Sequence, residues 1–321
     1  FVSKAQKDDT KSIETQPTIS AAFNSGLLVL LAQAAESPRF ETVQLSKYEE
    51  NTDFVVGRQF GALMYTLPVP KREKVVAFRG TDNSLIGWKE DFEIVCTEQT
   101  PAQESACRYL DDVIGLFSSK VTVCGHSKGG NLAVYASALS SPKNRGKIAR
   151  IINFDGPGFD FSILPRAHFS NWEDKIRNFI PQESMVGMLL EPVGKRKVIS
   201  SASWGINQHN ALNWQVKRTH FVPATMSRTT KLLEDTLNTW LAELPLPKRK
   251  LFIDALFDVL GAADGRKIDP KEDIKEFKNI LIKYSKLDRK TKLLLFEVFS
   301  SFNAKTRDTL TKTIRENLPR I

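Results

Sequence analysis

A serine between two glycines carries the clearest chemical signal in this sequence. Residues 121–136 read VTVCGHSKGGNLAVYA, and Gly125, Ser127 and Gly129 form a Gly-x-Ser-x-Gly pattern. The pattern alone arises by chance in roughly one chain in ten of this length. Its flanks are more specific, because a β-branched run enters it and a helix-like run leaves it, as at a strained strand-to-helix turn. We therefore expect Ser127 to be a nucleophile and the N–H of Lys128, at a helix N-terminus, to hold an oxyanion.

Two other structures would produce a similar stretch of sequence. In the first, the turn is only a glycine-rich connection and Ser127 caps the helix. In the second, the turn is a phosphate-binding loop, which needs G-x-G-x-x-G and usually follows the first strand. The spacing here is different and the strand lies mid-chain, so we favour the nucleophile.

A serine nucleophile needs a general base, and on this kind of turn the acid and then the histidine follow the serine in the chain. Four histidines are present. His126 lies within the turn, too close to its own serine, and His168 and His220 adjoin aromatic residues. His209 lies in the loop-like segment SWGINQHNALNW, after the last strand-like run. We expect His209 to be the base, with His168 and His220 as alternatives.

The elements that would position these residues follow a regular rhythm. Two strand-like runs form a candidate hairpin, and a helical pattern then leads to four further strand-like runs; they cover residues 60–67 and 74–80, then 101–117, then 120–125, 149–155, 175–181 and 195–201. Strands that alternate with helices predict a mostly parallel sheet flanked by helices. Residues 1–18 are polar and read as a tail. After residue 226 the sequence shows only amphipathic helical patterns, so we predict a sheet domain at 19–225 and a helical module at 226–321.

Composition limits the function classes. The chain has 321 residues, of which 41% are hydrophobic and 26% charged, as in ordinary globular proteins. The formal charge is +9, but 46 Lys and Arg are scattered among 37 Asp and Glu, and no nucleic-acid-binding motif accompanies them. We therefore expect a mildly basic surface and no nucleic-acid partner.

Cysteine usage and apolar runs bear on location. Cys96, Cys107 and Cys124 are an odd number without metal-ligand spacing, which favours a reducing, cytoplasmic compartment. The longest apolar run, GLLVLLAQAA at 26–35, is far shorter than the roughly 20 residues of a membrane helix. Contact with a membrane surface stays open. The sequence begins at Phe1 without Met, which leaves open a missing upstream piece and a lost signal peptide.

Upstream of the serine, VVAFRGTDNSLIGWKEDF (residues 75–92) resembles class 3, fungal-type lipases, which carry F-R-G-[ST], a later Trp and then Asp. In this resemblance Thr81 takes the place of the oxyanion-hole hydroxy residue, while Trp88 and Asp91 match the residues that follow it. GHSKGGNLA matches the turn around the family's serine, with Lys128 where leucine is more usual. A wider set, FRGTD, GWKEDF, GHSKGGNLAVYA, FDGPGF, VGMLL and QHN, resembles more closely a bacterial family of uncharacterised lipase-like α/β-hydrolases. The resemblance implies the α/β-hydrolase fold and covers the helical end only vaguely.

Two carboxylates compete for the role of the triad acid. Asp155 closes the strand-like run RIINF and opens DGPGF, and it resembles the acid of pancreatic-type lipases, which follows the same strand. In class 3 lipases the acid follows the next strand. The ungapped match to that position is Ser184 in SMVGML, with Glu183 one residue before it. We favour Asp155 and keep Glu183 as the alternative. Asp155 is also explained as a turn cap, and Glu183 as a solvated surface charge.

These observations predict a serine hydrolase that cleaves a carboxylic ester, most simply an acyl or lipid ester, with Ser127, His209 and Asp155 as its triad. Thr81 and the Lys128 amide would hold the oxyanion, and no metal or organic cofactor is implied. The alternative is a catalytically inactive binding or scaffold protein that keeps the turn as structure. Acyl length, the choice between ester, thioester and amide, and the oligomeric state stay open.

Overall fold

A computed structural model describes residues 19–68, 73–82, 85–115, 120–260 and 282–317. The predicted tail at 1–18 lies outside the described residues. Within them, seven strands form one sheet whose spatial order equals the chain order. The strands are β1 (Gln44–Asp53), β2 (Arg58–Leu67), β3 (Glu73–Phe78), β4 (Val121–His126), β5 (Ile148–Phe154), β6 (Ile176–Pro181) and β7 (Arg196–Ile199).

Strand direction divides the sheet into two parts. β1, β2 and β3 pair antiparallel as a meander, whereas β3 to β7 pair parallel. The parallel strands require crossovers, and α-helices supply those from β3 to β4 and from β4 to β5. This arrangement confirms the predicted fold class, an α/β-hydrolase fold with a mostly parallel sheet flanked by helices. The carboxyl ends of β3, β4 and β5 meet at one edge, where ligands bind in such sheets.

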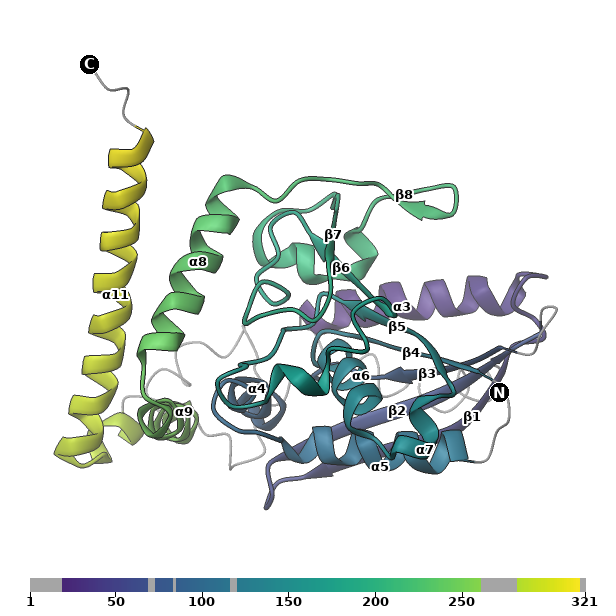
Figure 1. Ribbon diagram of the computed structural model, residues 1–321, viewed down its shortest axis with the longest axis horizontal. Coiled ribbons are helices and arrows are strands. Elements are labelled where there is room, and N and C mark those ends of the chain that lie inside the picture. The colour runs from purple at the N-terminus through teal and green to yellow at the C-terminus, as the bar shows by residue number, and fades with distance from the viewer. Residues whose placement is uncertain (1–18, 69–72, 83–84, 116–119, 261–281, 318–321) are drawn as a thin grey trace.

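The main core lies between the sheet and two helices, α5 (Pro101–Gly115) and α6 (Lys128–Leu139), which Figure 1 shows beside the central strands. Val76, Val123 and Ile151 from three neighbouring strands are fully buried. They join the buried faces of α5 and α6, including Leu110 and Leu132, in one apolar cluster. The β-branched residues that predicted β3 to β5 in the sequence therefore lie in this core.

The described residues after 226 contain only helices, as the sequence predicts. They form α8 (Arg228–Glu243), α9 (Leu246–Leu260) and α11 (Arg289–Asn317), which lie together on one side of the molecule in Figure 1. Phe252 and Phe257 of α9 pack with Leu295 and Val298 of α11. Residues 261–281 lie outside the described residues, and the boundary near 225 remains a prediction.

The helical segment also contacts the sheet domain through α4 (Leu85–Glu93) and the residue that follows it. Phe92 of α4 packs against Phe257 of α9 with ring centroids 5.4 Å apart. Ile94 forms a buried cluster with Leu241 of α8 and Leu190. The helix that follows the Thr81 segment therefore lies between the sheet and the C-terminal helices.

Three of the longer elements were not anticipated from the sequence: β1, α4 and α3 (Ile19–Glu36). β1 is an edge strand, mostly exposed and rich in polar residues, so it lacks the apolar alternation of a half-buried strand. Leu27 to Leu31 of α3 are each between 41% and 57% exposed. Among the helices of the described residues, none combines the length and apolar character needed to cross a membrane. The smaller elements are α7 (Pro142–Arg145), η1 (Arg166–His168), η2 (Gly205–His209), η3 (Ala211–Asn213), β8 (Val216–Lys217) and β9 (His220–Phe221).

Candidate active site

Ser127 is the single residue between β4 and α6, and its backbone is strained. Its φ of 58° and ψ of −131° form a combination that residues with a side chain rarely adopt. Glycine makes the turn possible on both sides. A Cβ on Gly125 would lie 2.1 Å from the carbonyl oxygen of Gly129, and a Cβ on Gly129 would lie 2.2 Å from that of Phe78. The Gly-x-Ser-x-Gly pattern therefore forms a sharp turn in which α6 starts in direct contact with β3 and β4.

The neighbouring strand ends enclose the serine. Ser127 N donates to the carbonyl oxygen of Phe154, the last residue of β5, at 2.9 Å. On the other side, a Cβ on Gly80 would lie 3.2 Å from the Cβ of Ser127. Gly80 thus leaves room for the serine side chain just after the end of β3, next to Thr81.

His209 ends the short helix η2 and meets Asp155, which directly follows β5. His209 Nδ1 lies 2.7 Å from Asp155 Oδ2, and the exposed fractions of the two side chains are 22% and 0%. An ionised carboxylate only accepts hydrogen bonds, so His209 Nδ1 carries the proton and donates it. His209 Nε2 is then the basic nitrogen. The structure brings these two predicted residues together across 54 positions of sequence.

The second oxygen of Asp155 is also satisfied. Asp155 Oδ1 accepts from Ser184 Oγ at 2.5 Å and from Gly187 N at 3.2 Å. Asp155 has a positive φ of 53°, a conformation that Asp tolerates better than most residues. The carboxylate therefore has donors on both sides that fix its orientation toward His209.

Glu183, the alternative acid, supports the loop of the histidine instead. Glu183 Oε2 accepts from Gly205 N at 2.8 Å and from Gln208 Nε2 at 3.1 Å. The Glu183 N–H in turn donates to Gln208 Oε1 at 3.0 Å. Gln208 is completely buried and precedes His209 in the chain. Glu183 thus holds η2 in place without contacting the imidazole of His209.

The other histidines occupy different surroundings. His126 Nε2 donates to the backbone carbonyl of His209 at 2.8 Å, and their ring centroids are 4.5 Å apart. Burial lowers the pKa of His126 to about 4, so this ring is neutral at pH 7. The sequence interpretation set His126 aside as a base and missed its contact with His209. His168 and His220 are exposed, in η1 and β9 respectively.

The two predicted oxyanion donors come from two segments next to the serine, the start of α6 and the residues after β3. The Lys128 N–H is in the first turn of α6, where N–H groups have no carbonyl partner within the helix. Thr81 follows Gly80, and its hydroxyl donates to Asp91 Oδ2 at 2.5 Å. Burial raises the pKa of Asp91 to about 6, although the nearby Lys128 ammonium opposes that shift. The hydroxyl of Thr81 is therefore held by α4.

Large apolar side chains are exposed on the segments that carry these residues. Trp204 is 78% exposed at the start of the His209 loop, and Leu212 is 39% exposed just after it. Trp88 on α4 and Met185, next to Ser184, are 41% and 37% exposed. Exposed large apolar side chains are common at sites for apolar ligands.

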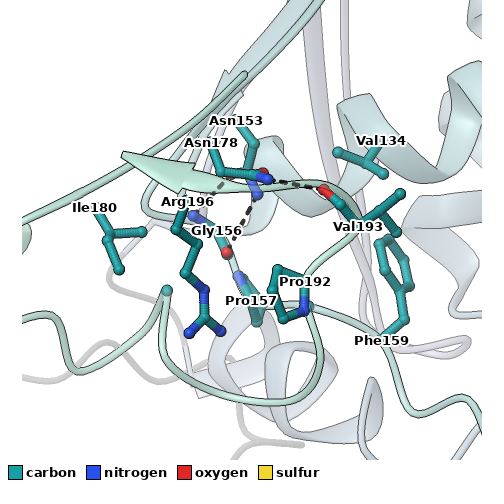
Figure 2. A pocket seen from close by; sticks show the side chains of 12 residues that line it. Val134, Asn153, Gly156, Pro157, Phe159, Asn178, Ile180, Pro192, Val193 and Arg196 are labelled. Carbon is teal, nitrogen blue, oxygen red and sulfur yellow. Dashed lines mark hydrogen bonds between the residues drawn. The ribbon is translucent and has the colours of Figure 1, made fainter. Parts of the chain in front are cut away.

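A small cavity of about 10 Å³ lies beneath the loop after β5, with room for roughly one water molecule. Figure 2 shows Asn153, Asn178 and Arg196 around it. Neither Ser127 nor His209 lines this cavity, and it is too small for an acyl chain. No group of three or more His, Cys, Asp or Glu residues in the described part of the chain is arranged to hold a metal ion.

The chain belongs to the Mbeg1-like family, whose model matches residues 34–258. No curated protein matches it. Among solved structures it is similar to M37 lipase, with 15% identity and a TM-score of 0.38 over 67% of this chain and 74% of that one. It is also similar to the Rhizomucor miehei lipase propeptide complex, with 17% identity and a TM-score of 0.37 over 54% of this chain and 61% of that one.

Proposed function

We propose that this member of the Mbeg1-like family is a serine hydrolase that cleaves a carboxylic ester, with Ser127, His209 and Asp155 as its triad. The observation that carries the proposal is the 2.7 Å contact between His209 Nδ1 and Asp155 Oδ2, beside the strained turn of Ser127. A buried acid, an oriented imidazole and a serine on a sharp strand-to-helix turn are the parts that acyl transfer to serine requires.

In the first half of the reaction, Ser127 Oγ attacks the acyl carbon while His209 Nε2 takes the serine proton. Asp155 keeps the other proton on Nδ1 and stabilises the imidazolium that forms. The backbone N–H groups of Lys128 and Thr81 stabilise the oxyanion, since the one hydroxyl proton of Thr81 is donated to Asp91. The tetrahedral intermediate then collapses, the bond to the alkoxide oxygen breaks, and His209 gives its proton to the leaving alcohol.

In the second half, water replaces the alcohol. His209 Nε2 takes a proton from the water as the oxygen attacks the acyl-serine, and the same oxyanion donors act again. Collapse releases the carboxylic acid and returns the proton to Ser127. No step draws on a group from outside the chain except water.

The proposed substrate class rests on exposed apolar side chains in the segments that carry the proposed site residues. Trp204, Leu212, Met185 and Trp88 expose apolar area on the segments that carry His209, Ser184 and Asp91. Apolar groups at a binding site favour apolar ligands, because both surfaces lose water on binding. We therefore propose an acyl ester, including a lipid ester, as the substrate.

The test is covalent labelling of the folded protein with a fluorophosphonate probe, followed by peptide mapping. The proposal expects the label on Ser127, no label in Ser127→Ala, and turnover of activated esters by the parent. A series of p-nitrophenyl esters from acetyl to palmitoyl would then define the preferred acyl length. Label at another residue, or none on the folded parent, would refute the hydrolase and favour the inactive binding or scaffold protein.

A further inference from the structure

The side chain of Lys128 runs into the protein interior, beneath the turn of the serine. Its exposed fraction is 1%, and that of Glu90 on α4 is 0%. Lys128 Nζ donates to Glu90 Oε2 at 3.0 Å and to Gln59, at 2.8 Å to its carbonyl oxygen and 2.6 Å to Oε1. These contacts use all three donors of the ammonium group.

Glu90 connects four elements through this contact. Besides Lys128, its Oε2 accepts from Gln59 N at 3.0 Å, and its Oε1 accepts from Ala102 N in the first turn of α5 at 2.6 Å. The carboxylate therefore ties α4 to β2, to α5 and, through Lys128, to α6. Each contact is local to the sheet edge where Ser127 lies.

Stability alone is a poor explanation for a buried ion pair of this kind. Removing two charges from water is costly, and well-packed apolar residues of similar volume often support a fold equally well. A hydrogen-bonded ion pair differs from an apolar contact in fixing distances and directions between elements.

Both proposed oxyanion donors depend on the elements that the pair joins. The first donor is the backbone N–H of Lys128 itself. The second, Thr81, is held through its hydroxyl by Asp91, the residue after Glu90 on α4. Lys128 Nζ also lies 3.9 Å from Asp91 Oδ1. A shift of α4 relative to α6 would therefore move the two donors relative to each other.

We propose that Lys128 and Glu90 are positioning residues whose buried ion pair sets the spacing between the two oxyanion donors. This inference rests on the proposed function, because it assigns the pair a task in that same site. It makes Lys128 a double contributor, through its N–H toward the oxyanion and through its side chain toward α4.

The experiment compares Lys128→Met, Glu90→Gln and the double variant with the parent. Each single variant leaves one buried group without its partner and is expected to be much less stable than the double variant. The double variant removes both charges and is the informative one. Arg196→Met is the matched control, because it breaks a partly buried ion pair with Glu234 that joins β7 to α8 and includes neither Lys128 nor Glu90.

The first measurement is kcat and KM on a p-nitrophenyl ester, well below the unfolding midpoint of each variant. The oxyanion forms only on the way to the transition state, so we expect the double variant to lose about 10²-fold in kcat with KM within about threefold. Arg196→Met should lose stability and keep its kcat. A folded double variant with the kcat of the parent would overturn the inference.

The second measurement does not depend on catalysis. Hydrogen exchange of peptides that cover 85–93 and 125–131 should accelerate in the double variant, while exchange in β5 stays as in the parent. Unchanged exchange in both peptides would contradict the positioning role, whatever the activity. If the folded parent neither reacts with a fluorophosphonate nor cleaves esters, the proposed function fails, while the exchange data still decide whether the pair fixes α4 to the turn.

Discussion

Replacing Asp155 by asparagine tests the proposed triad most directly, because the structure predicts how the amide will sit. Asp155 Oδ1 accepts from two donors, Ser184 Oγ and Gly187 N, whereas among the described residues Oδ2 accepts only from His209. The single amide oxygen of the introduced asparagine should therefore stay on the side with two donors. Its NH₂ group then faces His209 Nδ1, which has to become an acceptor.

This change of tautomer determines how much kcat should fall. With Nδ1 as acceptor, the neutral imidazole carries its proton on Nε2 and has no lone pair there for the proton of Ser127. We expect kcat to fall by about 10⁴-fold, which corresponds to about 5 kcal/mol in the activation free energy. The side chains have nearly the same shape and the contacts to Ser184 and Gly187 persist, so the free energy of unfolding should change by no more than about 1 kcal/mol.

The assay measures kcat on an activated ester beside a urea unfolding curve for each variant, with Glu183→Gln as the comparison. Glu183 uses one oxygen, Oε2, for both of its acceptor contacts to the His209 loop, and glutamine retains one oxygen that can accept both. We therefore expect Glu183→Gln to stay within about tenfold of the parent. If Asp155→Asn stays within that range while Glu183→Gln collapses at unchanged stability, the assignment of the acid is wrong.

The remaining predictions concern stability. His126 has its pKa lowered from 6.5 to about 4 by burial, so its contribution to stability is lost as the pH falls between these values, and His126→Gln should remove that loss. Burial raises the pKa of Asp91 from 3.8 to about 6, so its contribution to stability falls as the pH rises between these values, opposite to the effect of His126. Asp91→Asn should remove this fall in stability. Denaturation curves at several pH values test the His126 and Asp91 predictions, and stability profiles that run parallel in parent and variants would refute them. Gly129→Ala places a Cβ 2.2 Å from the carbonyl oxygen of Phe78 and should cost at least about 2 kcal/mol of unfolding free energy, whereas stability equal to the parent would show that the turn relaxes.

Much of the sheet could be predicted because its central strands are largely buried. The runs predicted at 120–125 and 149–155 lie within one residue of β4 and β5 at each end. Buried parallel strands are apolar and β-branched along their length, so they stand out from their neighbours. β1 was missed for the opposite reason. It is an edge strand whose residues face solvent, so its polar composition does not indicate a strand, and its pairing with β2 forms it.

The local geometry of the Ser127 turn could be predicted from the sequence, whereas contacts between distant segments could not. The turn around Ser127 depends on five consecutive residues, and its steric needs appear as glycines in the sequence. The partner of Lys128 is Glu90, 38 positions earlier, and no local pattern connects them. The substitution of lysine for the more usual leucine was visible, but its explanation requires the distance between α4 and α6.

The choice between the two acids illustrates how a parallel sheet makes neighbouring strand ends interchangeable. The resemblance to class 3 lipases gives the acid position to Ser184, after β6, whereas Asp155 follows β5. β5 and β6 pair in parallel, so their carboxyl ends lie side by side, and neighbouring strands are only about 4.8 Å apart. A carboxylate after either strand can therefore reach a histidine in the loop above them. In this chain the two positions touch, because the hydroxyl of Ser184 donates to Asp155 Oδ1 at 2.5 Å. The residue at the alternative acid position thus orients the carboxylate of its neighbour.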